Sequence, residues 1–312
     1  MLNKKKLFIS VIIPIFNGAS TIIKTLDSLL KQREFFDELI IINDASRDNS
    51  KKLVEEYLAG KIDYKLIDHK ANQGLSKTYN EGIINARGPL IVTMHQDVML
   101  MNNALKKLTE PFINEKVVAT GHITVFSLEL WKTFNFWQKT FFSRFYAKET
   151  FGLNGSFDCY RKEILERIGL FEDKPGEDGE IVYKLKKMGF IVQTKAKIIH
   201  MQNLRSDFGP RDIIYKLRLH SEARGGLLAR GRIKGPRSII KTFFRELLVL
   251  SIFVPFINIF GIVLIFFYSI LYTKQVYLEE YRNPRIIILP FWNIFLLFAG
   301  SYYSLKGFIY GR

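Results

Sequence analysis

Residues 8–18 read FISVIIPIFNG and residues 38–44 read ELIIIND, and these two segments decide the fold. Each is a short apolar run, rich in β-branched residues, that ends in polar residues, as a buried strand does. Between them, residues 19–32 repeat apolar side chains such as Ile22 and Leu26 at helical spacing. A helix between two buried strands predicts a parallel strand pair joined by a crossover helix.

The same alternation continues further along the chain. We expect a helix, a strand, a second helix and a second strand at residues 50–58, 64–68, 76–86 and 90–94. A hydrophobic content of 48% is sufficient for a large core. The order predicts an α/β domain over residues 1–210, with a mostly parallel sheet flanked by helices.

Polar residues gather at the points where the predicted strands end. In open α/β sheets, ligands bind outside the carboxyl ends of the strands, where loops present side chains without breaking the ladder. We therefore expect one binding site built from four clusters, which are Phe16-Asn17, Asn43-Asp44, Asn72-Gln73-Gly74 and His95-Gln96-Asp97.

The C-terminal part of the chain is apolar enough to enter a membrane. Residues 247–272 carry no charge, and as one helix they would reach roughly 39 Å, more than the roughly 30 Å of a bilayer core. A second uncharged run, residues 286–305, contains Pro290 and Asn293. We expect a transmembrane hairpin of two spans within residues 246–312. The alternatives are a buried helix of a soluble protein for the first run and an interfacial helix for the second.

The charge of the chain favours an anionic partner. There are 46 Lys and Arg against 30 Asp and Glu, a formal charge of +16. Residues 211–245 hold ten Lys or Arg against Asp212 and Glu222, directly before the first apolar run. We expect this segment to lie on anionic lipids, with the α/β domain in the cytoplasm. Because topology explains this basic segment, we expect no nucleic-acid partner.

The N-terminus and the only cysteine fit the same compartment. Residues 4–6 are lysines before an apolar run, as in a signal peptide, but Pro14 interrupts that run and no cleavage site follows. Cys159 stands alone, which excludes an intramolecular disulfide and fits a reducing compartment. We expect it to be a small buried hydrophobe.

Several motifs then occur in a fixed order: PIFNGASTIIKTLDSLLKQ (14–32), ELIIINDASRDNS (38–50), NQGLSKTYNEGI (72–83), VTMHQD (92–97) and GEDGEIVYKLKKMG (176–189). Over roughly residues 7–205 the chain resembles the family 2 glycosyltransferases. The resemblance implies the GT-A fold and a hexosyltransferase-like, inverting transfer of a sugar from a nucleotide-diphosphate donor.

Several residues resemble the donor site of that family. Asp44 resembles the acid that accepts a hydrogen bond from the nucleotide base, although a turn or cap role would also suit it. Lys77 is placed to meet a phosphate, and its alternative is a solvated lysine beside a glycine turn. The further donor-site candidates are Pro14, Phe16, Asn17, Asn72, Gly74 and Gln96.

His95-Gln96-Asp97 stands where the family carries Asp-x-Asp. The resemblance implies that Asp97 binds a divalent cation, Mn²⁺ or Mg²⁺, which neutralises the diphosphate leaving group. His95 replaces the first acid, so the site departs from the family pattern, which predicts either weaker metal binding or a preference for Mn²⁺ over Mg²⁺. His200 falls where relatives place a histidine of the metal or diphosphate site. A purely structural role is the alternative for both histidines.

Glu177 and Asp178 begin a predicted helix, where carboxylates are also common caps. By resemblance, Asp178 is the general base that takes the proton of the acceptor hydroxyl, with Glu177 as its neighbour. Pro175-Gly176 could belong to an acceptor loop. Residues 219–235 lack the Gln-x-x-Arg-Trp element of processive relatives, so we expect a single addition.

The acceptor is less defined than the donor. Residues 126–146 are dense in aromatic side chains and would suit a membrane interface, a path for a lipid-linked acceptor or a packed core. We expect a lipid-linked glycan or glycolipid acceptor in cell-surface polysaccharide synthesis. A polyprenyl phosphate acceptor is one alternative, and a non-catalytic nucleotide-sugar-binding subunit is another.

Overall fold

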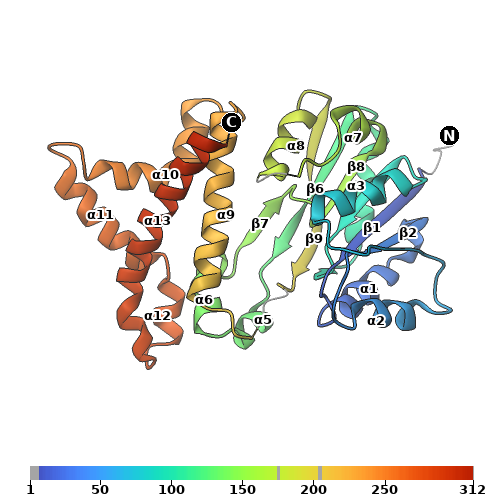
Figure 1. The fold of residues 1–312 in the computed structure, drawn as a ribbon, viewed down its shortest axis with the longest axis horizontal. Helices are drawn as coiled ribbons and strands as arrows, with labels where there is room; N and C mark the ends of the chain where they lie inside the picture. The colour runs from blue at the N-terminus through green and yellow to red at the C-terminus, as the bar shows by residue number, and fades with distance from the viewer. Residues whose placement is uncertain (1–6, 174–175, 203–205, 312) are drawn as a thin grey trace. The chain divides into compact units, whose positions relative to one another are not determined.

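A computed structural model describes residues 7–173, 176–202 and 206–311 of the chain (Figure 1). The chain divides into two compact units. The first unit consists of residues 1–127 and 148–203, and the second of residues 128–147 and 204–312. The lysines at positions 4–6 lie outside the described residues.

The first unit contains a nine-stranded sheet in its described residues. Its first half is the parallel array β3-β2-β1-β4, and the helices between these strands also lie where the sequence predicts them. The bounds are β1 Ile9–Ile15, α1 Ile22–Leu30, β2 Glu38–Asn43, α2 Ser50–Leu58, β3 Lys65–Asp68, α3 Leu75–Asn85 and β4 Leu90–Met94. Because these four strands are parallel, their carboxyl ends lie at one edge.

The second half of the sheet is largely antiparallel, and the prediction of a mostly parallel sheet is wrong there. Strand β8 runs antiparallel to β4 and to β6, and β5 runs antiparallel to β9. Only β6 and β9 pair in parallel in this half of the described sheet. The strands are β5 Val98–Leu100, β6 Val117–Val125, β7 Glu149–Gly152, β8 Phe157–Arg161 and β9 Phe190–His200.

Helices cover both faces of the sheet, which explains why every residue of β1 is buried. Val11 and Ile13 pack on one face, beneath α1, α2 and α4 (Ala104–Thr109). Ile12 points to the other face, beneath α3, α7 (Lys162–Ile168) and α8 (Glu177–Leu185). The polar residues after the strands are therefore presented by a rigid, fully covered scaffold.

The second unit is helical. Its elements are α5 Leu128–Thr133, α6 Phe136–Phe142, η3 Ser143–Phe145, α9 Pro210–Ala229, α10 Pro236–Ser251, α11 Asn258–Leu271, α12 Lys274–Glu279, η4 Pro284–Ile288 and α13 Leu289–Tyr310. Helices α9 and α13 touch through glycines. A Cβ on Gly225 would lie 2.0 Å from the Ser304 carbonyl oxygen, so no larger residue fits without a backbone shift.

The first apolar run does not form the single spanning helix that the sequence predicts. Residues 247–272 are divided between α10 and α11, with Pro255 and Phe256 (φ 70°) in the break. Proline removes a helical N–H and clashes with the preceding turn, so the helix stops there. At 14 residues, α11 is about 21 Å long, shorter than a bilayer core. The helix Pro284–Tyr310 is long and apolar enough to cross a membrane.

The aromatic segment 128–147 packs within the second unit, although the sequence analysis assigned it to the α/β domain. The Trp131 indole N–H donates to Glu279 at 2.6 Å, and the rings of Trp137 and Trp292 lie 5.4 Å apart. The chain thus enters the helical unit once between β6 and β7 and again after β9.

Candidate active site

The carboxyl edge of the parallel strands brings the predicted clusters together. Gln96, after β4, accepts from the Phe16 N–H and donates to the Phe16 carbonyl oxygen, both at 2.9 Å. A Cβ on Gly18 would lie 2.2 Å from the Gln96 side-chain oxygen, so glycine is needed for this approach. Gln96, predicted to bind donor, holds the loop after β1 in place.

Asp44, directly after β2, is the centre of a hydrogen-bond cluster that uses most, but not all, of its carboxylate. Its carboxylate accepts from the backbone N–H groups of Gln73 at 2.8 Å and Gly74 at 3.0 Å. The His69 Nδ1 lies 2.7 Å from Asp44 Oδ1, and its Nε2 lies 2.7 Å from a Glu81 carboxylate oxygen. Asp44 is only 3% exposed, and it fixes the glycine turn that begins α3.

The Asp44–His69 pair is an ion pair. Burial raises the pKa of Asp44, but the hydrogen bonds from Gln73, His69 and Gly74 outweigh it and lower that pKa overall. Burial lowers the pKa of His69, but the carboxylates of Asp44 and Glu81 outweigh it and raise that pKa overall. His69 was not among the predicted site residues, although it lies just after β3 and before the Asn72–Gly74 turn.

Three predicted ligands converge beside β4. His95, Asp97 and His200 each offer one donor atom, and these atoms lie within 4.8 Å of one another. Asp97 Oδ1 is 3.0 Å from His200 Nε2. The antiparallel pairing of β5 with β9, in which Val98 faces His200, produces this approach across a hundred residues of sequence.

His95 has an open nitrogen. Its Nε2 is buried and has no hydrogen-bond partner among the described residues. Burial, followed by the nearby His200, lowers the pKa of His95 to about 4, so the ring is neutral at physiological pH. A neutral imidazole with a buried Nε2, beside a carboxylate and a second imidazole, fits a divalent transition metal ion.

Tyr79 on α3 stacks on the ring of His95, with the ring centroids 6.3 Å apart. Its hydroxyl donates to the Gly155 carbonyl oxygen at 2.9 Å. Burial raises the pKa of Tyr79 well above its ordinary value, and the charges of Asp158, Asp178 and Asp97 raise it further. Asp178 is partly buried in the first turn of α8. The Glu177 side chain and Pro175 lie outside the described residues.

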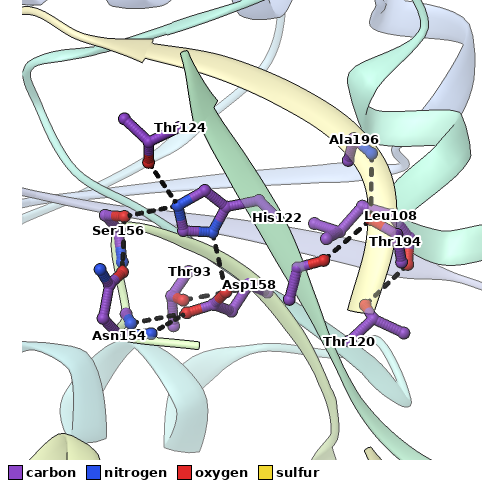
Figure 2. Close-up of polar contacts among 12 residues, drawn as sticks. Thr93, Leu108, Thr120, His122, Thr124, Asn154, Ser156, Asp158, Thr194 and Ala196 are labelled. Carbon is purple, nitrogen blue, oxygen red and sulfur yellow. Dashed lines mark hydrogen bonds and ion pairs between the residues drawn. The ribbon is translucent and has the colours of Figure 1, made fainter. Parts of the chain in front are cut away.

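Figure 2 shows a buried polar network around His122 and Asp158. It includes Ser156, whose carbonyl oxygen accepts from the His95 N–H at 2.9 Å. His122 Nδ1 lies 3.0 Å from Asp158, and His122 Nε2 lies 3.2 Å from the Ser156 hydroxyl. Asp158 also accepts from the backbone N–H groups of Asn154 and Gly155. This has the connectivity of a hydrolase triad, but Ser156 is 1% exposed and His122 fully buried, so substrate has no access to the hydroxyl.

The remaining predicted residues lie at the same edge. Lys77 pairs with Asp173 at 3.2 Å, with both side chains more than half exposed. Pro14 lies inside β1, opposite Ile42. A cavity of about 990 Å³ opens over the ends of β1 and β2, lined by the predicted Phe16, Asn17 and Asn72 and by the basic Arg47, Lys51, Lys52 and Lys70.

Together, the sheet order and the polar edge define a GT-A glycosyltransferase domain. Residues 10–169 match the sequence model of the family described as Glycosyl transferase family 2. Those 160 residues are just over half of the 312, and the chain belongs to this family.

Known proteins resemble the chain in part or throughout. The uncharacterized glycosyltransferase EpsJ of Bacillus subtilis is 35% identical over 102 residues, which is 33% of this chain and 29% of EpsJ. The chain thus spans less than a third of that relative's length.

Two solved structures share the fold over 96% of this chain at 16% identity. The mannosyltransferase PcManGT from Pyrobaculum calidifontis, in complex with GDP-Man and Mn²⁺, matches with a TM-score of 0.59 over 88% of its own chain. S. aureus TarS 1–349, in complex with UDP-GlcNAc, matches with a TM-score of 0.51 over 92% of its own chain.

Proposed function

We propose that the chain is a membrane-attached, inverting glycosyltransferase. It moves one sugar from a nucleotide-diphosphate donor to a lipid-linked glycan or glycolipid acceptor. The observation that carries this proposal is the meeting of His95, Asp97 and His200 at the edge where Asp178 also lies near Tyr79. A leaving-group site and a general base within one site are what sugar transfer requires.

The donor end of the site consists of Asp44 and the adjoining cavity. Asp44 Oδ1 accepts two hydrogen bonds, whereas Oδ2 accepts one among the described residues, which leaves Oδ2 to accept from a base N–H. Four basic residues line the cavity against the acidic Asp48, Glu55 and Asp68, and this small positive excess favours a diphosphate. The GDP-Man and UDP-GlcNAc complexes of the structural relatives support a nucleotide-sugar donor.

Asp97, His95 and His200 would hold a divalent cation. When bound, such a cation neutralises charge on the diphosphate leaving group. The two imidazoles favour Mn²⁺ over Mg²⁺, because nitrogen donors suit transition metals. The Mn²⁺ in the PcManGT complex is consistent with this choice.

Asp178 completes the reaction as the base. Its carboxylate takes the proton of the acceptor hydroxyl while that oxygen attacks the anomeric carbon opposite the leaving group. A single displacement inverts the configuration at that carbon. Retention of configuration would contradict this assignment.

Membrane attachment is supported by the surface of the second unit. Only 28% of the most apolar stretch in Pro284–Tyr310 is buried, whereas a core helix of a soluble protein would be mostly covered. Large apolar side chains of α10, α11 and α13 are exposed, among them Phe244, Leu250, Ile259, Phe260, Phe291 and Phe295. We propose α13 as a span, with the α/β domain in the cytoplasm.

A donor screen on the detergent-solubilised full chain tests the proposal. We expect one of the UDP-, GDP- or dTDP-sugars to raise the thermal midpoint only when Mn²⁺ is present. Asp97→Ala should abolish this shift, and the exposed Asp63→Ala should retain it. An equal shift in Asp97→Ala would contradict the cation site. Donor binding without sugar transfer to any lipid-linked acceptor would favour the alternative of a non-catalytic binding subunit.

A further inference from the structure

The second unit holds a basic cavity whose lining includes none of the residues assigned to the proposed reaction. The cavity has a volume of about 460 Å³, and its basic lining residues come from three elements, which are η3 (Arg144), α9 (His220, Arg224) and α10 (Lys241, Arg245). The Tyr268 and Tyr272 side chains line it from α11 and its C-terminal end. Apolar residues such as Leu217, Phe244 and Leu296 complete the wall.

Positive charge in this cavity exceeds the negative charge available to it. No carboxylate lines the cavity among the described residues. Glu246 lies next to it and pairs with Arg224 at 2.9 Å. Neither Lys241 nor Arg245 forms a salt bridge with any residue that the structure describes. Gathering like charges in a partly enclosed space is unfavourable unless an anion compensates them.

The guanidinium groups are held in position. Arg224 donates to the Thr242 carbonyl oxygen at 3.2 Å and to Glu246, while its buried Nε has no hydrogen-bond partner among the described residues. Arg144 lies over the ring of Phe145, 4.6 Å from the centroid, and donates to the Tyr272 hydroxyl at 3.3 Å. Fixed guanidinium groups suit phosphate, because they can donate two parallel hydrogen bonds to its oxygens.

The surroundings of the cavity indicate a ligand with an apolar part. Phe244, which lines the cavity, is 55% exposed, and Leu247 and Leu250 on the same helix are exposed as well. A free inorganic anion would have no use for this apolar rim. A lipid headgroup would place its phosphate among the arginines and its chains along the exposed helices.

We infer that this cavity binds the phosphate headgroup of a membrane lipid. The inference rests on the membrane attachment in the proposed function, but not on its chemistry. The same phosphate chemistry has two sources, which are a bilayer phospholipid and the diphosphate of a polyprenyl-linked acceptor.

The test measures binding of the full chain to lipid in detergent micelles. The probes are phosphatidylglycerol, polyprenyl diphosphate, phosphatidylcholine and inorganic pyrophosphate. The cavity variant is Lys241→Gln with Arg245→Gln, and its matched control is Lys274→Gln with Arg282→Gln, two exposed cations outside the cavity. We expect the cavity variant to lose about tenfold or more in affinity and the control less than about twofold.

The outcomes separate the two sources. Loss confined to polyprenyl diphosphate supports an acceptor site, and loss with both anionic lipids supports a phospholipid site. Equal losses in the two variants, or pyrophosphate binding as tight as lipid binding, would overturn the inference. Lys241→Arg with Arg245→Lys keeps the charge and should retain binding, which separates a ligand role from misfolding. Donor-induced stabilisation should persist in the cavity variant, so failure here is distinguishable from failure of the proposed function.

Discussion

Two histidine–carboxylate clusters stand at the same edge of the sheet, and they differ in how far their hydrogen-bonding capacity is used. We call Asp44 with His69 the closed cluster, because both ring nitrogens face carboxylates and the Asp44 carboxylate also accepts two backbone N–H groups. We call His95, Asp97 and His200 the open cluster, because His95 Nε2 is buried without a partner among the described residues.

The difference indicates how each cluster contributes. A closed cluster lowers the free energy of the folded state, and here only Asp44 Oδ2 keeps capacity for one further hydrogen bond, the one proposed from the base. An open cluster keeps a buried nitrogen, His95 Nε2, without a hydrogen-bond partner among the described residues, which costs stability until a ligand binds to it. Substitutions in the closed cluster should therefore reduce stability, and those in the open cluster should reduce activity.

The largest expected effect is on activity in the open cluster. Asp97→Asn removes the only carboxylate among these three residues, and we expect the rate of sugar transfer to fall about 100-fold or more. The thermal midpoint without donor should change little. Steady-state transfer assays and thermal unfolding on one preparation check both parts. An activity of Asp97→Asn within tenfold of wild type would contradict the assignment of the open cluster to ligand binding.

The next effect is on stability in the closed cluster. His69→Ala leaves the buried Asp44 carboxylate without its cation, and we expect the free energy of unfolding to fall by about 3 kcal/mol. Chemical denaturation measures this change. Lys70→Ala, at the exposed neighbouring position, is the matched control, and its free energy of unfolding should stay near that of the wild type. A decrease no larger in His69→Ala than in Lys70→Ala would show that the cluster does not stabilise the fold.

The pH dependence of the closed cluster follows from its pKa shifts. The raised pKa of His69 gives stability that is present below its unfolded value near 6.5 and is lost as pH rises through the folded value. The lowered pKa of Asp44 gives stability that is present above 3.8 and is lost as pH falls through the folded value. The stability difference between wild type and His69→Ala should thus be largest between about pH 4 and 6.5. Denaturation across pH 4 to 9 checks this, and a difference that grows above pH 7 would contradict it.

The smallest effect concerns the buried network in Figure 2. Ser156→Ala removes the hydroxyl that donates to Asn154 and contacts His122, and we expect a loss of about 1 kcal/mol in unfolding free energy. Sugar transfer should stay within a few-fold of wild type, because the hydroxyl is buried. Loss of all activity at unchanged stability would assign Ser156 a chemical role instead.

Much of the parallel half of the fold was predictable, because its signals are local. The strands and helices up to β4 follow from periodicity and from the polar residues after each strand. The grouping of these polar residues then follows from parallel pairing alone. The network of His122, Asp158 and Ser156 had no such local signal. Antiparallel pairing between β6 and β8 brings His122 to the other two residues from far away in the sequence.

The helical unit was harder to predict, because a long apolar run does not determine where a helix ends. Hydrophobic length alone favoured one helix over residues 247–272, whereas Pro255 divides it. The proline was the available signal, and it outweighs apolar content because it removes a backbone donor and clashes with the preceding turn. Residues 128–147 belong to this unit because of long-range aromatic contacts, which no local sequence pattern indicates.

The most direct test of the central claim is Mn²⁺ binding measured by electron paramagnetic resonance in the presence of a nucleoside diphosphate. The account predicts one tightly bound ion per chain, lost in His95→Ala and in Asp97→Asn and kept in His69→Gln. Equal Mn²⁺ binding in wild type and Asp97→Asn, or loss of the ion only in His69→Gln, would contradict the division between an open ligand site and a closed structural pair.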